Sequence, residues 1–168
     1  MVMNSLVLGL RRSPKMRMIS NSVNRSKAYE QTLQILGGTG TKLFPTLRDA
    51  LSFAAALGYR ERRRWPLDPK AGKEDIQAQI YNENDAIDLI FAIGLAEKKS
   101  AEILKRENEK ECIEIFEEYA NGGLALITEW IDRYADLDVE VAIWRGLKTI
   151  DFIPQAESSE NPTVSIEF

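Results

Sequence analysis

The chain has 168 residues, of which 44% are hydrophobic and 29% charged, enough for one globular domain with a hydrophobic core. It contains no histidine and one cysteine, Cys112. These counts exclude Ser-His and Cys-His nucleophile pairs, histidine-containing zinc sites and an internal disulfide framework. No apolar run approaches the roughly 18 residues of a membrane span. We therefore expect a cytoplasmic protein that is not an enzyme, needs no cofactor or metal, and does not bind a membrane.

The net charge of −4 hides an asymmetry along the chain. Residues 1–66 contain 12 basic and 3 acidic side chains (net +9), whereas residues 67–168 contain 10 basic and 23 acidic ones (net −13). Two interpretations are open. Either a basic surface meets phosphate and an acidic one meets a basic partner protein, or the two portions pack together and partly neutralise each other.

Residues 1–21 contain four basic side chains and no acidic one. We expect a basic, disordered arm, or an upstream start codon in place of Met16 or Met18; an arm that follows nucleic acid is the alternative. A first helix is predicted over residues 23–36 and ends at Gly37, Gly38 and Gly40. This GGTG stretch lacks the preceding strand and the GK[ST] ending of a P-loop, which favours a linker over a phosphate site.

The clearest helix is predicted over residues 46–59. Thr46 is a good N-cap, and Asp49 stands in the capping-box position three residues later. Gly58 is expected to end this helix. One face is apolar and consists of Leu47, Ala50, Leu51, Ala54 and Leu57.

A basic aromatic segment follows directly, with Arg60, Arg62, Arg63, Arg64 and Trp65. Arginine can pair bidentately with phosphate and tryptophan can stack on a base, so these five residues are the candidate DNA-binding site. Cations are also favoured at a helix C-terminus, and arginines pair readily with acidic side chains of the same chain. Both interpretations are open.

Further short helices are predicted over residues 73–81, 85–97 (capped by Asn84), 109–120, 124–134 and 139–147, with Ser100 capping a short element between them. Asn121-Gly122-Gly123 is expected to end the helix over residues 109–120 in a turn. The fold class is therefore all-α, a compact bundle of about six or seven short helices over residues 22–150. The residues expected in the core are Ile76, Ile80, Ile87, Ile90, Phe91, Leu95, Ile103, Leu104, Cys112, Ile115, Phe116, Tyr119, Ile127, Trp130, Ile131, Tyr134, Val141 and Trp144.

The remaining polar clusters favour ordinary surface roles. Glu114 and Glu117 or Glu118 have a spacing found in carboxylate metal sites, but those sites usually add histidine, so a solvated helix face is the better interpretation. Cys112 lies on an apolar face, which favours a core position over a nucleophile. Residues 151–168 are expected to form a mobile tail, whose alternating end (TVSIEF) could also be a docking peptide.

Two segments together resemble a known family. The first is Phe44-Pro45-Thr46-Leu47-Arg48-Asp49-Ala50-Leu51-Ser52-Phe53-Ala54-Ala55-Ala56-Leu57-Gly58-Tyr59 with the arginines and Pro66-Leu67, and the second is Ile115-Phe116-Glu117-Glu118-Tyr119-Ala120-Asn121-Gly122-Gly123-Leu124, ending near Trp130. They resemble the motifs of the small DNA phosphorothioation-associated proteins (the Dnd-system-associated protein 4 family), over about residues 22–150. The resemblance implies an accessory role in bacterial systems that place sulfur in the DNA backbone and restrict unmodified DNA. It carries over no active-site residue.

Three functional hypotheses result. The first is an adaptor that docks other phosphorothioation-system proteins through its acidic body and a FEEYANGG turn, with Glu117, Glu118, Tyr119 and Asn121 as candidate partner-binding residues. The second is a DNA-binding subunit that contacts backbone phosphates through the arginine cluster, without sequence preference. The third is an enzyme that uses carboxylates.

Overall fold

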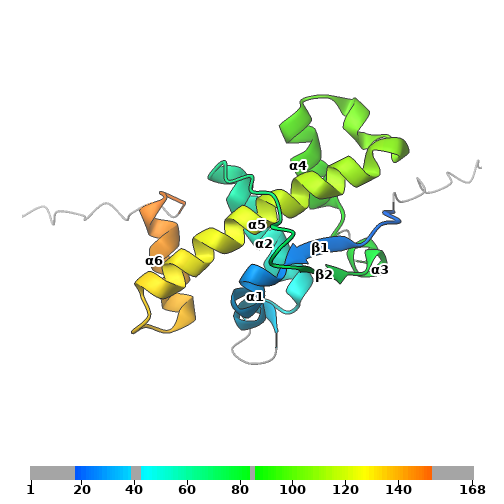
Figure 1. Ribbon diagram of the computed structural model, residues 1–168. Helices are drawn as coiled ribbons and strands as arrows, with labels where there is room; N and C mark the ends of the chain where they lie inside the picture. The colour runs from blue at the N-terminus through cyan, green and yellow to red at the C-terminus, as the bar shows by residue number, and fades with distance from the viewer. Residues whose placement is uncertain (1–17, 39–42, 84–85, 153–168) are drawn as a thin grey trace, which may run out of the picture.

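One long helix, α5 (Glu109–Arg133), runs through the centre of the molecule, and most other elements pack along it (Figure 1). The computed structural model describes residues 18–38, 43–83 and 86–152. Helix α4 lies toward one end of α5 and α6 lies at the other (Figure 1). The other elements, in chain order, are β1 (Val23–Ser26), a 3-10 turn (Lys27–Tyr29), α1 (Glu30–Gly37), α2 (Leu47–Arg60), β2 (Lys73–Ile76), α3 (Ala78–Asn82), α4 (Asp88–Lys98), two 3-10 turns (Ala101–Leu104 and Arg106–Asn108) and α6 (Val139–Thr149).

The predicted all-α fold class is confirmed in the sense that the described residues are mostly helical, with six α-helices and one small sheet. A single hydrophobic core joins α1, α2, α4 and α5. None of the helices in the described ranges combines the length and the apolar character needed to cross a membrane. The largest fully buried side chains are Trp130, Tyr81, Phe116, Leu33, Leu36, Leu51, Leu57, Ile90, Ile115, Leu124, Ile127 and Val23.

Helix α2 begins as the sequence predicts. The Thr46 hydroxyl accepts a hydrogen bond from the Asp49 backbone N–H at 3.1 Å, so Thr46 is the N-cap. The end is different, because Gly58 lies inside the helix and is buried. The helix ends after Arg60 in a Schellman motif: Arg62 has a left-handed φ of 56°, and the Arg63 N–H bonds the Gly58 carbonyl at 2.8 Å.

The predicted helix stop at Asn121-Gly122-Gly123 is wrong, because α5 continues through it to Arg133. Helix α2 and the segment after it press against α5 at this place. A Cβ atom at Gly123 would collide with the backbone oxygen of Ala54, and one at Gly122 with that of Arg63. The two glycines therefore allow one backbone to approach another inside a helix, a role different from ending it.

The predicted helices over residues 23–36 and 73–81 are wrong in their first four residues. These form a two-stranded antiparallel sheet, in which Val23 lies opposite Ile76 and Ser26 opposite Lys73. Val23 and Ile76 are both buried, so this cross-strand pair contributes apolar area to the core beside α5. The helical parts begin later, at Glu30 and Ala78, and Ile80 is exposed.

The predicted basic arm ends four residues too late. Ile19 is buried, and its N–H donates to the Asn82 side-chain oxygen at 2.8 Å. The N–H groups of Ser20 and Asn21 both donate to one carboxylate oxygen of Glu109, at 2.7 and 3.0 Å. Residues 18–21 thus belong to the folded body. Residues 1–17 lie outside the described residues.

The remaining boundaries shift by a few residues. Helix α4 begins at Asp88 without a side-chain cap, and the predicted cap Asn84 lies outside the described residues. Ser100 does cap the next turn, since its hydroxyl accepts the Glu102 N–H at 3.3 Å. Leu95, Val141 and Trp144 are exposed, so their predicted core positions are wrong. At the end of α6 the Phe152 N–H bonds the Leu147 carbonyl at 3.0 Å, and the predicted tail beyond residue 152 is not described.

Candidate functional site

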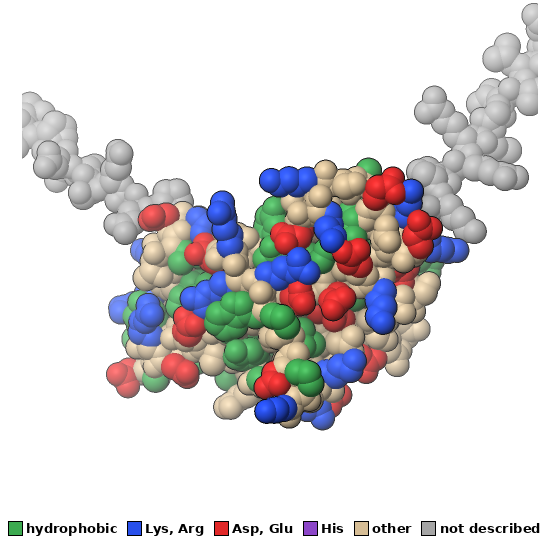
Figure 2. All heavy atoms as spheres, turned by 45° about the horizontal axis from the view of Figure 1, so that its top comes forward, with side chains coloured by type: hydrophobic (Ala, Val, Ile, Leu, Met, Phe, Trp, Pro, Cys, Tyr) green, Lys and Arg blue, Asp and Glu red, His purple; other side chains and the backbone are tan. Residues whose placement is uncertain are grey.

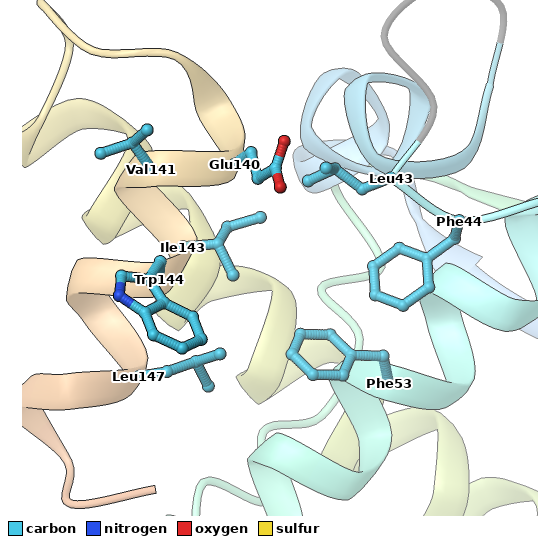
Figure 3. A pocket seen from close by; sticks show the side chains of 8 residues that line it. All are labelled: Leu43, Phe44, Phe53, Glu140, Val141, Ile143, Trp144 and Leu147. Carbon is cyan, nitrogen blue, oxygen red and sulfur yellow. The ribbon is translucent and has the colours of Figure 1, made fainter. Parts of the chain in front are cut away.

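An apolar groove of about 360 Å³ lies between α6 and the first half of α2 with the loop before it. Leu43 and Phe44 come from that loop and Phe53 from α2, while α6 supplies four side chains to the opposite wall (Figure 3). The Phe44 and Phe53 rings touch, with centroids 5.1 Å apart. The α6 wall consists of Val141, Ile143, Trp144 and Leu147, and Glu140 lies at one edge.

The groove stays open because α6 has more apolar residues than it can bury against α5. Ala142, Ile143 and Gly146 form its buried face, and Gly146 lies directly against the Trp130 indole. Val141 and Trp144 fall on the neighbouring face, where 39% and 50% of their surface is exposed. Leaving a large aromatic side chain half exposed gives up hydrophobic stabilisation, at about 25 cal/mol per Å². Contiguous exposed apolar surface of this kind is typical of an interaction site.

The sequence alone does not predict this groove, because its two walls are almost a hundred positions apart in the chain. The apolar pattern of the sequence instead predicts core positions for Val141 and Trp144. A signal was present: α6 has apolar residues on two adjacent faces, wider than the stripe that a helix at the edge of a bundle can bury.

The predicted DNA-binding arginines are mostly engaged within the molecule. Arg63 forms a two-pronged pair with Glu129 at 2.7 and 3.3 Å. Arg64 contacts Glu118 at 2.5 Å and Glu97 at 2.9 Å. Basic and acidic side chains are interspersed over the face shown in Figure 2. These contacts agree with the interpretation in which the basic and acidic portions of the chain pack together and partly neutralise each other.

The rest of the segment is also held in place. Arg60 contacts Glu61 at 2.6 Å and donates to the Ile150 carbonyl at 2.7 Å. Trp65 is 41% exposed, with the Arg63 guanidinium over its ring at 5.4 Å. Among the described residues, Arg62 is the arginine of this segment whose side chain is exposed and forms no ion pair.

Three of the four predicted partner-binding residues are buried in the middle of α5, so the expected exposed turn is wrong. Glu117 accepts both its hydrogen bonds from Asn24. The Asn121 amide donates to the Trp65 and Pro66 carbonyls at 3.2 and 3.1 Å. Tyr119 donates its hydroxyl hydrogen to Glu97 at 2.6 Å, and Glu118 is the half-buried partner of Arg64. These side chains hold the arginine segment and β1 against α5.

The hydrogen bond between Tyr119 and Glu97 shifts the pKa values of both groups. Burial and the hydrogen bond to Glu97 raise the pKa of Tyr119 to about 12. The hydrogen bond from Tyr119, with the nearby Arg64 guanidinium, lowers the pKa of Glu97. Both groups therefore keep their usual charge at neutral pH, which suits a permanent ion-pair network. The described residues do not gather three carboxylate, histidine or cysteine side chains in a way that could hold a metal ion.

The fold and the groove define a small, mostly helical protein with an open hydrophobic surface. A model of one protein family, described as DNA sulphur modification system-associated protein 4, matches residues 22–149. The chain belongs to that family. The family predicted from the two motifs is thereby confirmed. We found no match to this chain among curated proteins or among solved structures.

Proposed function

We propose that this protein is an adaptor of a DNA sulphur modification system, and that it binds another protein of that system through the apolar groove between α2 and α6. The observation that carries the proposal is the groove itself: seven apolar side chains, two of them exposed large hydrophobics, face a hollow of about 360 Å³. That volume lies within the roughly 300–1000 Å³ of protein binding pockets.

A protein segment suits this groove better than a small polar ligand. The lining offers one charged side chain, Glu140, at the edge, so the occupant must be mainly apolar. An amphipathic helix that places two or three large apolar side chains in a groove between helices is a common recognition mode. A lysine or arginine beside that apolar face would complement Glu140. Family membership supports the choice of partner, because the family is described by its association with a DNA sulphur modification system.

Trp144 is the side chain on which binding should depend most. It is large, half exposed in the free protein and positioned in the α6 wall, and tryptophan is enriched among residues that dominate interface energies. The test is biolayer interferometry of the full chain against each purified protein of the system. We expect one of them to bind, and Trp144→Ser to weaken that binding about thirtyfold or more, the effect of losing roughly 2 kcal/mol.

Trp65 supplies a matched control, since it is also an exposed tryptophan but lies outside the groove. Trp65→Ser should leave the affinity within about twofold, a change well below 1 kcal/mol. Equal losses in both variants, or binding that neither variant affects, would place the interface elsewhere. Circular dichroism of both variants separates lost contact from lost folding.

Direct DNA binding is the less supported alternative. Arg60, Arg63 and Arg64 would have to leave their intramolecular partners to reach phosphate. Within this described segment, Arg62 is the arginine that forms no ion pair. The proposal also assigns no catalysis to this chain, in line with the lack of histidine.

A further inference from the structure

A polar hollow of about 430 Å³ lies between α5 and the strand β1 with its partner β2. A second hollow, of about 350 Å³, adjoins it. Asn24, Lys73 and Glu117 line both, so these three residues stand at the junction. The first hollow is otherwise lined largely by polar and charged groups, whereas the second adds the apolar Leu67 and Pro69 together with Asp68 and Gly72.

Glu117 is a buried carboxylate with one oxygen left open to this junction. Glu117 as a whole is only 9% exposed. Both of its hydrogen bonds, from the Asn24 backbone N–H at 2.6 Å and the Asn24 amide at 2.9 Å, converge on Oε1. Its Oε2 accepts none from the described residues. Burial raises the pKa of Glu117, which reflects the cost of keeping the charge there without further donors. A donor group from solution would offset that cost.

The charges that line the first hollow are balanced, and the second hollow adds one more carboxylate, that of Asp68. Lys73, Lys110 and Glu114 line the first hollow together with Glu117, two charges of each sign. None of the four forms an ion pair with another described residue, in contrast to the arginine segment. A simple cation would meet two lysines here, and a simple anion would meet two glutamates. A molecule that carries both charges avoids either repulsion.

We propose that this junction binds a small zwitterion of the α-amino acid type with an apolar side chain. The ammonium group donates to Glu117 Oε2, and the carboxylate pairs with Lys73. The side chain then extends into the adjoining hollow toward Leu67 and Pro69, which supply its apolar lining. This proposal is independent of the docking groove, because none of these residues lines that groove.

The test is isothermal titration calorimetry of the full chain with L-leucine. Two blocked forms serve as probes: N-acetyl-L-leucine has no ammonium group and L-leucinamide has no carboxylate. We expect L-leucine to bind, and each blocked form to bind about tenfold or more weakly, the effect of losing a hydrogen bond to a charged group. Glu117→Gln and Lys73→Met should each weaken L-leucine binding by a similar factor. Lys70→Met, an exposed lysine near the same strand that lines neither hollow, should have no effect.

Three results would overturn the proposal. The first is no heat from L-leucine at millimolar concentration. The second is binding of a blocked form as tight as that of L-leucine, which would mean a site for a simple cation or anion. The third is full affinity in Lys73→Met. Lys73 is exposed, so that variant is expected to fold even if Glu117→Gln does not, and it keeps the test decisive.

Discussion

At the scale of single residues, two buried glutamates of α5 explain why the chain before α1 is a strand and not the first turns of a helix. Glu109 and Glu117 lie eight positions apart on α5 and each accepts backbone N–H groups of residues 20–24. Hydrogen bonds from backbone N–H groups to a carboxylate are charge-assisted and strong, so they favour the extended course of this segment. The sequence showed Glu117 only as a member of an acidic stretch, because nothing local distinguishes a glutamate that faces β1 from one that faces water.

Substitution of Glu117 should have opposite effects depending on the replacement. Glu117→Gln keeps an oxygen for the Asn24 donors and removes the buried charge, whereas Glu117→Ala leaves those donors unsatisfied and should cost about 1–3 kcal/mol of unfolding free energy. Because burial raises the pKa of Glu117 in the folded chain, the folded state binds that proton more tightly than the unfolded state. The stability contribution of this group is therefore largest below the unfolded pKa and falls as pH rises through the folded one.

The measurement is urea unfolding of wild type and Glu117→Gln between pH 4 and pH 8. The glutamine variant does not titrate at this position, so its stability relative to wild type should increase as pH rises from the unfolded pKa, about 4.3, through the raised folded one. A glutamine variant that loses stability relative to wild type over this range would show that the charged form is the favoured one in the folded chain.

Arg62 offers a second test at this scale. It occupies the left-handed position of the Schellman motif after α2, with φ of 56°, where glycine is favoured. We expect Arg62→Gly to raise the unfolding free energy by about 0.5–1 kcal/mol, since it relieves this backbone cost. Arg62→Ala removes the same charge without relieving the backbone and should bring no such gain. If both variants gain equally, the effect comes from charge and not from conformation.

At the scale of elements, the sequence correctly predicts the starts of helices that a nearby capping side chain determines. Thr46 caps α2 and Ser100 caps the turn after α4, as the sequence indicates. Within the described residues, the Asp49 carboxylate accepts from Arg48 and forms no hydrogen bond back to the Thr46 N–H. The helix end predicted at Gly122-Gly123 is wrong because glycine has two different roles in helices. Glycine ends a helix when the chain turns there, but it also permits close approach when another backbone crosses, and only the tertiary partner decides between the two.

Gly123→Ala tests that explanation through the sign of its effect. Glycine in a helix interior is normally destabilising relative to alanine by roughly 0.5–1 kcal/mol, so an unconstrained site would gain stability. Here the new Cβ would collide with the Ala54 backbone oxygen, and backbone cannot move aside as a flexible side chain can. We expect a loss of about 1–3 kcal/mol, measured by chemical denaturation. A gain in stability would mean that α2 and α5 do not pack as closely as described.

At the scale of the whole molecule, folding neutralises part of the charge asymmetry of the sequence. The basic segment after α2 lies against acidic side chains of α4 and α5, so Glu97, Glu118 and Glu129 neutralise two of its arginines. Both interpretations of that asymmetry are compatible with the sequence. The sequence does not decide between them because the ion pairs join positions up to 66 residues apart. The apolar groove was hidden for the same reason, since it exists only where α6 comes back beside α2.

The ion pairs of the arginine segment lead to a prediction about DNA binding. Ion pairs that are partly exposed contribute only about 0–1 kcal/mol to stability, but they occupy the guanidinium donors that phosphate would need. The intact chain also has a net charge of −4, which opposes approach to a polyanion. We therefore expect fluorescence anisotropy with labelled duplex DNA, with or without phosphorothioate, to show no saturable binding at micromolar protein and physiological salt.

A variant with Arg62, Arg63 and Arg64 all replaced by alanine, confirmed as folded by circular dichroism, should behave like wild type. Salt-sensitive binding that this variant loses would instead make the protein a DNA-contacting subunit, because counterion release from phosphate is the signature of such contact.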